Sequence, residues 1–153
     1  MLPSDYEERV RRKAGELFRR DELNCAEAAF KALLVEAGTP CPVEVLCVAS
    51  PFGRGMGGAG CCCGALIGAQ LALGRLHGRR KDHGAVPRDC CDLARQLHDG
   101  FAALNRATCC RVLHKGHPLA ARSSWSPARN APRPPLPWPP PCCSRLQCPE
   151  RRA

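Results

Sequence analysis

Proline is concentrated at one end of this chain of 153 residues, and this limits where a regular fold can form. Ten of the fifteen prolines follow residue 117. Residues 114–153 hold seven Lys or Arg against one acidic residue, so most of the formal net charge of +9 also belongs to this end. Because proline fixes φ and lacks a backbone N–H, it interrupts helices and strands. We therefore predict a compact domain over residues 1–117 and a disordered Pro/Arg/Cys-rich tail over residues 118–153.

Apolar residues recur at helical spacing through the first part of the compact domain. One such repeat runs from Asp5 to about Asp21. The next spans residues 25–37, and Asn24 with Glu27 forms a capping-box pair at its start. The brief apolar run of residues 43–49 fits either a short strand or a helical turn. These patterns predict two helices followed by one ambiguous segment.

Helical patterns continue through the second part of the domain. Residues 62–73 predict a helix in which Gly64 and Gly68 would let another backbone approach closely. Residues 87–104 predict a helix whose apolar face includes Cys90 and Leu104, and a short helical segment follows over residues 108–113. The sequence therefore predicts an all-α fold, a small bundle of four to five helices.

Thirteen cysteines are an unusually high number for a chain of this length. The acidic and polar start does not resemble a secretory signal, and no apolar run approaches the roughly 18 residues of a membrane span. We therefore expect a cytoplasmic protein without a membrane partner, in which cysteines serve metal ligation or redox chemistry more often than structural disulfides. No CxxC pair occurs, so any site must be assembled from distant segments.

The run of Cys61, Cys62 and Cys63 lies between a glycine-rich loop and the start of a predicted helix. The unsatisfied N–H groups of a helix N-terminus favour thiolate over thiol, and thiolates bind soft metals and exchange disulfides. Cys25 is expected at the first position of its own helix. Cys41, Cys47, Cys91 and Cys109 are interpreted as incidental.

Several of these segments together resemble the C-GCAxxG-C-C putative redox-active proteins, a family of small helical proteins. The resemblance covers residues 10–115. It rests on the residues around Asn24 and Cys25, the glycine loop of residues 52–60, the run CGALIGAQLALG from Cys63, and the segment that ends in Cys110, Arg111, Val112 and Leu113. It implies that Cys25, Cys63 and Cys110 are family cysteines. It also implies redox activity or a metal or iron–sulfur centre.

On this basis we predict that Cys25, Cys63 and Cys110 converge to hold an iron–sulfur cluster or another soft metal, for electron transfer or redox sensing. The fourth ligand is left open between Cys90 and the tail cysteines. A c-type haem is not expected because no CxxCH is present. The sequence identifies no catalytic residue, and neither the redox partner nor the oligomeric state is fixed. The tail cysteines are Cys142, Cys143 and Cys148.

Three alternatives remain at this point. A thiol–disulfide couple without metal would use the same cysteines, and a non-redox metal carrier would use them as ligands only. Nucleic-acid binding is less favoured, because aromatic residues make up only 5% of the chain and offer no stacking platform.

The tail departs from the pattern of the family. Members continue into a further helix with a fourth cysteine, whereas this chain continues into proline and arginine. We attribute the change after about Lys115 to a shift of reading frame. Resequencing the gene should then reveal the missing helix in another frame, and its absence there would refute this explanation.

Overall fold

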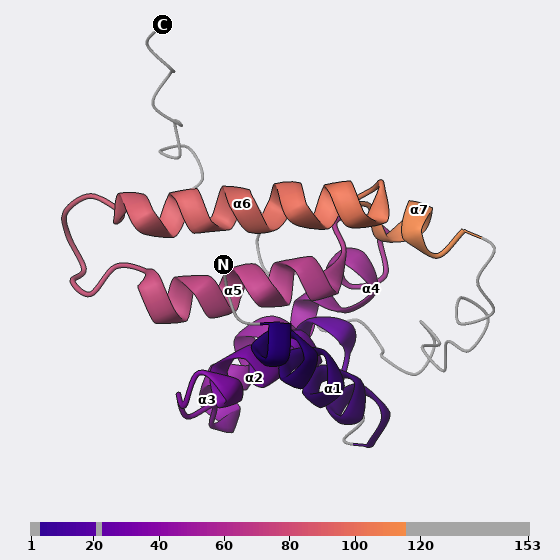
Figure 1. Ribbon diagram of the computed structural model, residues 1–153, viewed down its shortest axis with the longest axis horizontal. Helices are drawn as coiled ribbons and strands as arrows, with labels where there is room; N and C mark the ends of the chain where they lie inside the picture. Colours follow the sequence, from indigo (N-terminus) through magenta and orange to yellow (C-terminus); the bar gives the residue numbers. More distant parts are fainter. Residues whose placement is uncertain (1–3, 21–22, 116–153) are drawn as a thin grey trace, which may run out of the picture. The chain divides into compact units, whose positions relative to one another are not determined.

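The computed structural model describes residues 4–20 and 23–115. In these residues the only strand-like pairing is an isolated antiparallel bridge between Cys62 and Cys109. The prediction of an all-α fold is therefore confirmed (Figure 1). The elements are α1 (Ser4–Arg20), α2 (Cys25–Glu36), α3 (Val43–Leu46), the 3-10 helix η1 (Cys47–Phe52), α4 (Gly53–Met56), α5 (Gly64–His77), α6 (Arg88–Asn105) and α7 (Cys110–Leu113).

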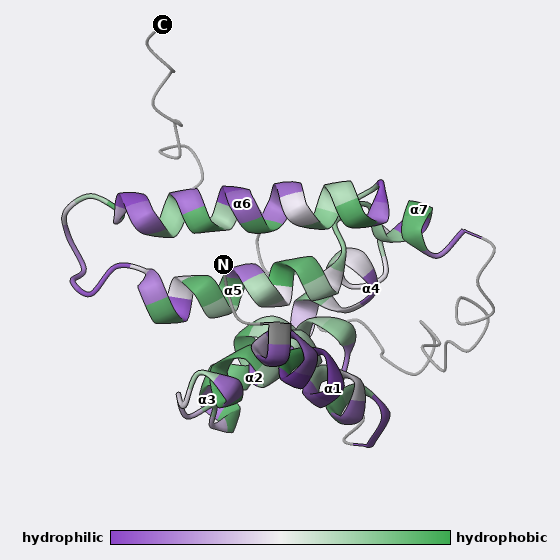
Figure 2. Cartoon of the chain, viewed as in Figure 1, coloured by the Kyte–Doolittle hydropathy of each residue, from purple (hydrophilic) through white to green (hydrophobic). Residues whose placement is uncertain are grey.

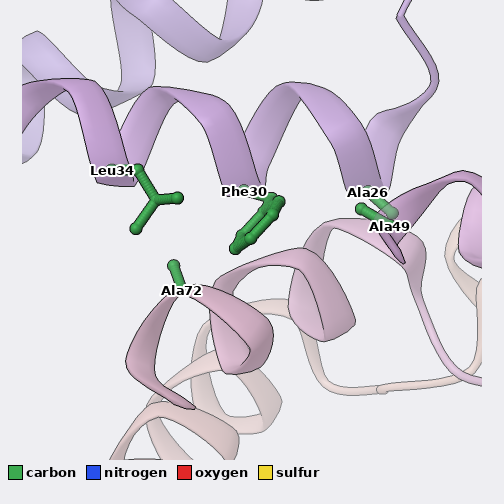
Figure 3. Close-up of a cluster of buried hydrophobic side chains, with 5 residues drawn as sticks. All are labelled: Ala26, Phe30, Leu34, Ala49 and Ala72. Carbon is green, nitrogen blue, oxygen red and sulfur yellow. The ribbon is translucent and has the colours of Figure 1, made fainter. Parts of the chain in front are cut away.

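Helix α2 is central to the packing, because both α1 and α5 lie against it. Towards α1, Leu17 is buried with Ala28 and Ala32, and Arg9 forms an ion pair with Glu36 at 3.1 Å. Towards α5, α2 contributes to a second buried cluster, shown in Figure 3. The members of this cluster are Ala26, Phe30, Leu34, Ala49 and Ala72.

The start of α2 is fixed by the capping box that the sequence predicts. The Asn24 side-chain oxygen accepts hydrogen bonds from the backbone N–H groups of Ala26 at 2.9 Å and Glu27 at 3.1 Å. The Glu27 carboxylate in turn accepts from the Asn24 N–H at 2.9 Å. These bonds give partners to backbone N–H groups at the start of α2 that have none within the helix. They also define the position of Cys25, the first residue of the helix.

Glycine allows α2 and α5 to approach closely. A β-carbon on Gly68 would overlap the backbone carbonyl of Ala26, and both Gly64 and Gly68 are buried. The expected close approach of another backbone at these glycines is therefore confirmed. The contact sets the start of α5 beside the start of α2.

The segment between α2 and α5 is helical where the sequence left the choice open. Residues 43–52 form α3 and η1. The expected loop that follows contains the short element α4, in which Arg54 and Gly55 depart from helical geometry. Arg54 and Met56 adopt positive φ values of 56° and 65°, which is unusual for residues other than glycine.

The next helix begins later than predicted. Cys62 is held in the bridge with Cys109, so α5 starts at Gly64 with Cys63 as its N-cap. A hydrogen bond of 2.7 Å from the Gln70 side chain to the Ala94 carbonyl joins α5 to α6.

Helix α6 lies along α5 and has no fully buried residue. Hydrophobic and hydrophilic residues alternate along it, as Figure 2 shows. The prediction that Leu104 belongs to its packed face is wrong, because this side chain is 85% exposed near the helix end.

No helix among the described residues is both long and apolar enough to cross a membrane. The predicted tail, with its three cysteines, lies outside the described residues, so the division into a domain and a tail stays a prediction.

Candidate functional site

Three cysteines from distant parts of the sequence each stand at the start of a helix. Cys25 is the first residue of α2, Cys63 is the N-cap of α5, and Cys110 is the first residue of α7. Helix N-termini carry unsatisfied N–H groups and a partial positive charge, which suits sulfur ligands or thiolates. All three thiols are free.

The Cys25 sulfur lies against the start of α5 because Gly64 has no side chain. A β-carbon on Gly64 would lie 2.5 Å from the Cys25 sulfur and 2.7 Å from the carbonyl oxygen of Phe52. The Cys25 sulfur therefore rests against the backbone of the residue that directly follows Cys63. Only glycine leaves room for it there.

Cys110 is placed by the glycine loop. Its N–H donates to the Cys61 carbonyl at 2.5 Å, and the neighbouring Arg111 N–H donates to the Gly60 carbonyl at 2.9 Å. A β-carbon on Gly55 would lie 2.6 Å from the Cys110 β-carbon. Gly55 also has a φ of 70°, which other residues rarely adopt. The positive φ and the missing side chain of Gly55 therefore let the loop pack against Cys110.

The pKa of Cys110 is affected by burial and by the charges of Cys63, Cys25 and Arg54. Burial raises the pKa of the Cys110 thiol, and negative charge on Cys63 and then on Cys25 would raise it further. The Arg54 guanidinium acts in the opposite direction and lowers it. At this position burial outweighs the thiolate-favouring effect of a helix start.

The preference for thiolate that was expected in the cysteine run does not hold at Cys62. Burial raises the pKa of Cys62, and charge on the adjacent thiols would raise it as well. A thiol at a helix start is therefore not sufficient for a low pKa in this chain, because removal from water favours the neutral form.

The sequence profile of one family, described as putative redox-active protein (C_GCAxxG_C_C), matches residues 23–147. The chain belongs to this family. The resemblance predicted from the sequence is confirmed, although the match starts later and extends beyond residue 115. A search of curated proteins and a search of solved structures each gave no match.

Of the three cysteines that the resemblance assigned to the C_GCAxxG_C_C pattern, the Cys25 sulfur lies against Gly64, next to Cys63, and the charges of Cys63 and Cys25 act on Cys110. Cys63 and Cys110 are buried, with 9% and 5% of their surfaces exposed, whereas Cys25 is half-buried. What these thiols bind or exchange stays a prediction.

Cys90 does not lie with the other three. The hydrogen bond between Gln70 and Ala94 fixes the register of α5 against α6, and the two helices run in opposite directions (Figure 1). Cys63 precedes Gln70 by two helical turns, and Cys90 precedes Ala94 by one. At a rise of 1.5 Å per residue, Cys90 is displaced along the helices by roughly 16 Å from Cys63.

The described donors do not make a metal site in this arrangement. Within residues 4–20 and 23–115, no group of three or more His, Cys, Asp or Glu side chains could hold a metal ion. The four histidines of this part of the chain are exposed. They are His77, His83, His98 and His114.

Two features of the site were not predicted. Gly55 leaves space for the Cys110 side chain, and the charge of Arg54 lowers the pKa of Cys110. Both residues adopt positive φ values, which the sequence pattern does not reveal. Cys109, interpreted as incidental, pairs with Cys62, and its thiol donates to the Gly60 carbonyl at 3.1 Å. The adjacent cysteines at both positions were a signal that could have drawn attention to this pair.

Proposed function

We propose that this protein is a thiol-based redox protein in which Cys25 and Cys63 form a reversible disulfide and Cys110 is the third thiol of the site. The observation that carries the proposal is the contact of the Cys25 sulfur with the backbone of Gly64, next to Cys63. Membership of the C_GCAxxG_C_C family, described as putative redox-active, supports the same conclusion.

Accessibility assigns a different role to each thiol. Cys25 is half-buried, so a disulfide on a partner molecule can reach it. Cys63 is buried, and in this proposal it attacks the sulfur of Cys25 once a mixed disulfide has formed. Burial raises the pKa of Cys110, which therefore stays protonated at neutral pH and does not compete as the first nucleophile.

The electron balance is that of thiol–disulfide exchange. The Cys25 thiolate attacks one sulfur of a partner disulfide, the partner bond breaks, and one partner thiolate leaves. The Cys63 thiolate then attacks the Cys25 sulfur and releases the second partner thiolate. The two cysteines lose two electrons and two protons, and the partner disulfide gains them as two thiols. The proposed partner is thus a protein or small molecule with an exposed disulfide.

Both cysteines of the proposed couple lie at helix starts, since Cys25 is the first residue of α2 and Cys63 is the N-cap of α5.

An iron–sulfur or other soft-metal centre is the second candidate, because thiols at helix starts are suitable soft donors. Three thiols are fewer than the four of a closed zinc or iron–sulfur site. The described residues, as arranged, do not fit such a centre, and a fourth donor would have to come from residues beyond them.

The proposal is tested by purifying the full chain without oxygen and measuring metal content, the visible spectrum and the number of free thiols. We expect no stoichiometric metal and no visible band. On oxidation with a small-molecule disulfide, Cys25→Ser should lose two thiols fewer than the wild type. Cys91→Ser is the matched control, because Cys91 lies on α6 outside the proposed couple, and it should form as many intramolecular disulfides as the wild type.

Two results would overturn the proposal. A visible band that bleaches on reduction, together with stoichiometric iron, would replace the disulfide couple by an iron–sulfur centre. An equal loss of thiols in Cys25→Ser and in the wild type would remove Cys25 from the chemistry.

A further inference from the structure

We propose that Cys62 and Cys109 form a second, redox-sensitive disulfide, separate from the thiols of the proposed site, that fastens the Cys110 segment to the start of α5. These two cysteines lie outside the set that the family resemblance assigns.

The backbone places Cys62 and Cys109 directly opposite each other. They form the isolated antiparallel bridge of the described residues. The flanking residues supply its hydrogen bonds, since the Cys63 N–H donates to the Thr108 carbonyl at 2.7 Å and the Cys110 N–H donates to the Cys61 carbonyl at 2.5 Å. Cys62 and Cys109 are therefore the non-hydrogen-bonded type of pair.

This type of pair has a spacing that suits a disulfide. The α-carbons of a non-hydrogen-bonded pair are about 4.5 Å apart, and their side chains leave the same face of the ladder. Disulfides join α-carbons that are about 4.4–6.8 Å apart. The bond can therefore form with little movement of the backbone.

Two further observations place the thiols close together. Negative charge on Cys109 is among the causes that raise the pKa of Cys62, after burial and the charges of its own neighbours. The Cys109 thiol donates to the Gly60 carbonyl at 3.1 Å, which holds it beside the segment that carries Cys62. Both residues are half-buried, so a small reagent can reach them.

The bridge also separates this pair from the proposed site. Successive residues of an extended segment point to opposite faces, so Cys63 leaves its segment on the face opposite to Cys62. Cys63 and Cys110 are buried, whereas Cys62 and Cys109 are only half-buried. Two groups of thiols thus occupy the two sides of one short pairing.

The oxidant is a low-molecular-weight disulfide. One of the two thiolates attacks a sulfur of the reagent, whose bond breaks, and one reagent thiolate leaves. The other cysteine then attacks the protein sulfur of the mixed disulfide and releases the second reagent thiolate. Cys62 and Cys109 lose two electrons and two protons, which the reagent gains as two thiols. The product closes the loop that contains α5 and α6.

The full chain is tested with oxidised glutathione as the probe, followed by alkylation, trypsin digestion and fragment mass spectrometry. We expect peptide 55–75 linked to peptide 107–111, with the bond assigned to Cys62 and Cys109. Oxidation should also raise the Tm by at least about 5 °C, because a cross-link restricts the unfolded chain. Cys62→Ser should lose the linked peptides and show a smaller rise in Tm, whereas Cys61→Ser, in the same peptide, should keep the linked peptides and the full rise.

Absence of this linked pair would overturn the proposal, as would a link between peptides 55–75 and 107–111 that runs through Cys61, Cys63 or Cys110, or a link between two copies of the chain. The proposed site would instead yield peptide 21–31 linked to peptide 55–75. Either disulfide can therefore be refuted without the other.

Discussion

The sulfur of Cys25 lies where a side chain on Gly64 would have to be. One missing β-carbon thus brings the first residue of α2 into contact with the start of α5, where Cys63 is the N-cap. The glycine of the family pattern is therefore part of the thiol site itself, and it also lets the two helices approach.

Replacing Gly64 with alanine should displace the Cys25 sulfur. Because the new β-carbon would lie 2.5 Å from that sulfur, we expect formation of the Cys25–Cys63 disulfide to slow by roughly tenfold or more. The rate is measured by quenching the oxidation with an alkylating agent at timed intervals. Gly74→Ala, in the same helix but with open space around it, is the control. An unchanged rate in Gly64→Ala would contradict the proposed geometry.

Gly68→Ala should destabilise the fold without removing any thiol. Its β-carbon would overlap the Ala26 carbonyl, and overpacking of this kind costs about 1–3 kcal/mol in the free energy of unfolding. Gly74→Ala should instead gain up to about 1 kcal/mol from helix propensity. Chemical denaturation of the two variants under reducing conditions distinguishes them. Equal stabilities would mean that α2 and α5 do not pack as closely as described.

Arg54→Gln should raise the pKa of Cys110 further. The guanidinium lowers this pKa by its positive charge, and glutamine removes that charge. The pH profile of Cys110 alkylation, followed by mass spectrometry, should therefore move to higher pH. Arg95→Gln, on the exposed face of α6 and paired with Asp92, is the control and should leave the profile in place. A shift to lower pH in Arg54→Gln would refute the role of Arg54.

Stability under reducing conditions should fall in alkaline solution. Burial raises the pKa of folded Cys110 above the ordinary thiol value of 9.0, so above this pH the unfolded chain loses its proton first. The folded state then binds more protons than the unfolded state, and the free energy of unfolding decreases as pH rises. The contribution is fully present below pH 9.0 and is lost as pH passes through the raised pKa. Cys110→Ser should show a smaller decrease between pH 8 and pH 10 in denaturation experiments, and an equal decrease would count against this assignment.

The helices could be predicted from the sequence because they depend on local patterns. The Asn24 and Glu27 pair fixed the start of α2, and the apolar repeats gave α1 and α6 to within a residue or two. The glycine spacing in α5 also indicated close helix packing.

The site was only partly predictable, since its geometry depends on contacts between distant segments. The pairing of Cys62 with Cys109 delays the start of α5 and places α7, yet no local pattern encodes it. The positive φ values of Arg54 and Met56 likewise result from the fold around them. Burial, which the sequence does not reveal, raises the pKa of Cys62 and so reverses the thiolate preference expected at this position of the cysteine run.

The most direct test of the thiol site is the identity of the peptides that become linked when the reduced, metal-free protein is oxidised. Peptide 21–31 joined to peptide 55–75 through Cys25 and Cys63 is the predicted product, and reduction should release both peptides. If Cys25 stays alkylated as a free thiol while other cysteines are oxidised, the proposed couple is contradicted.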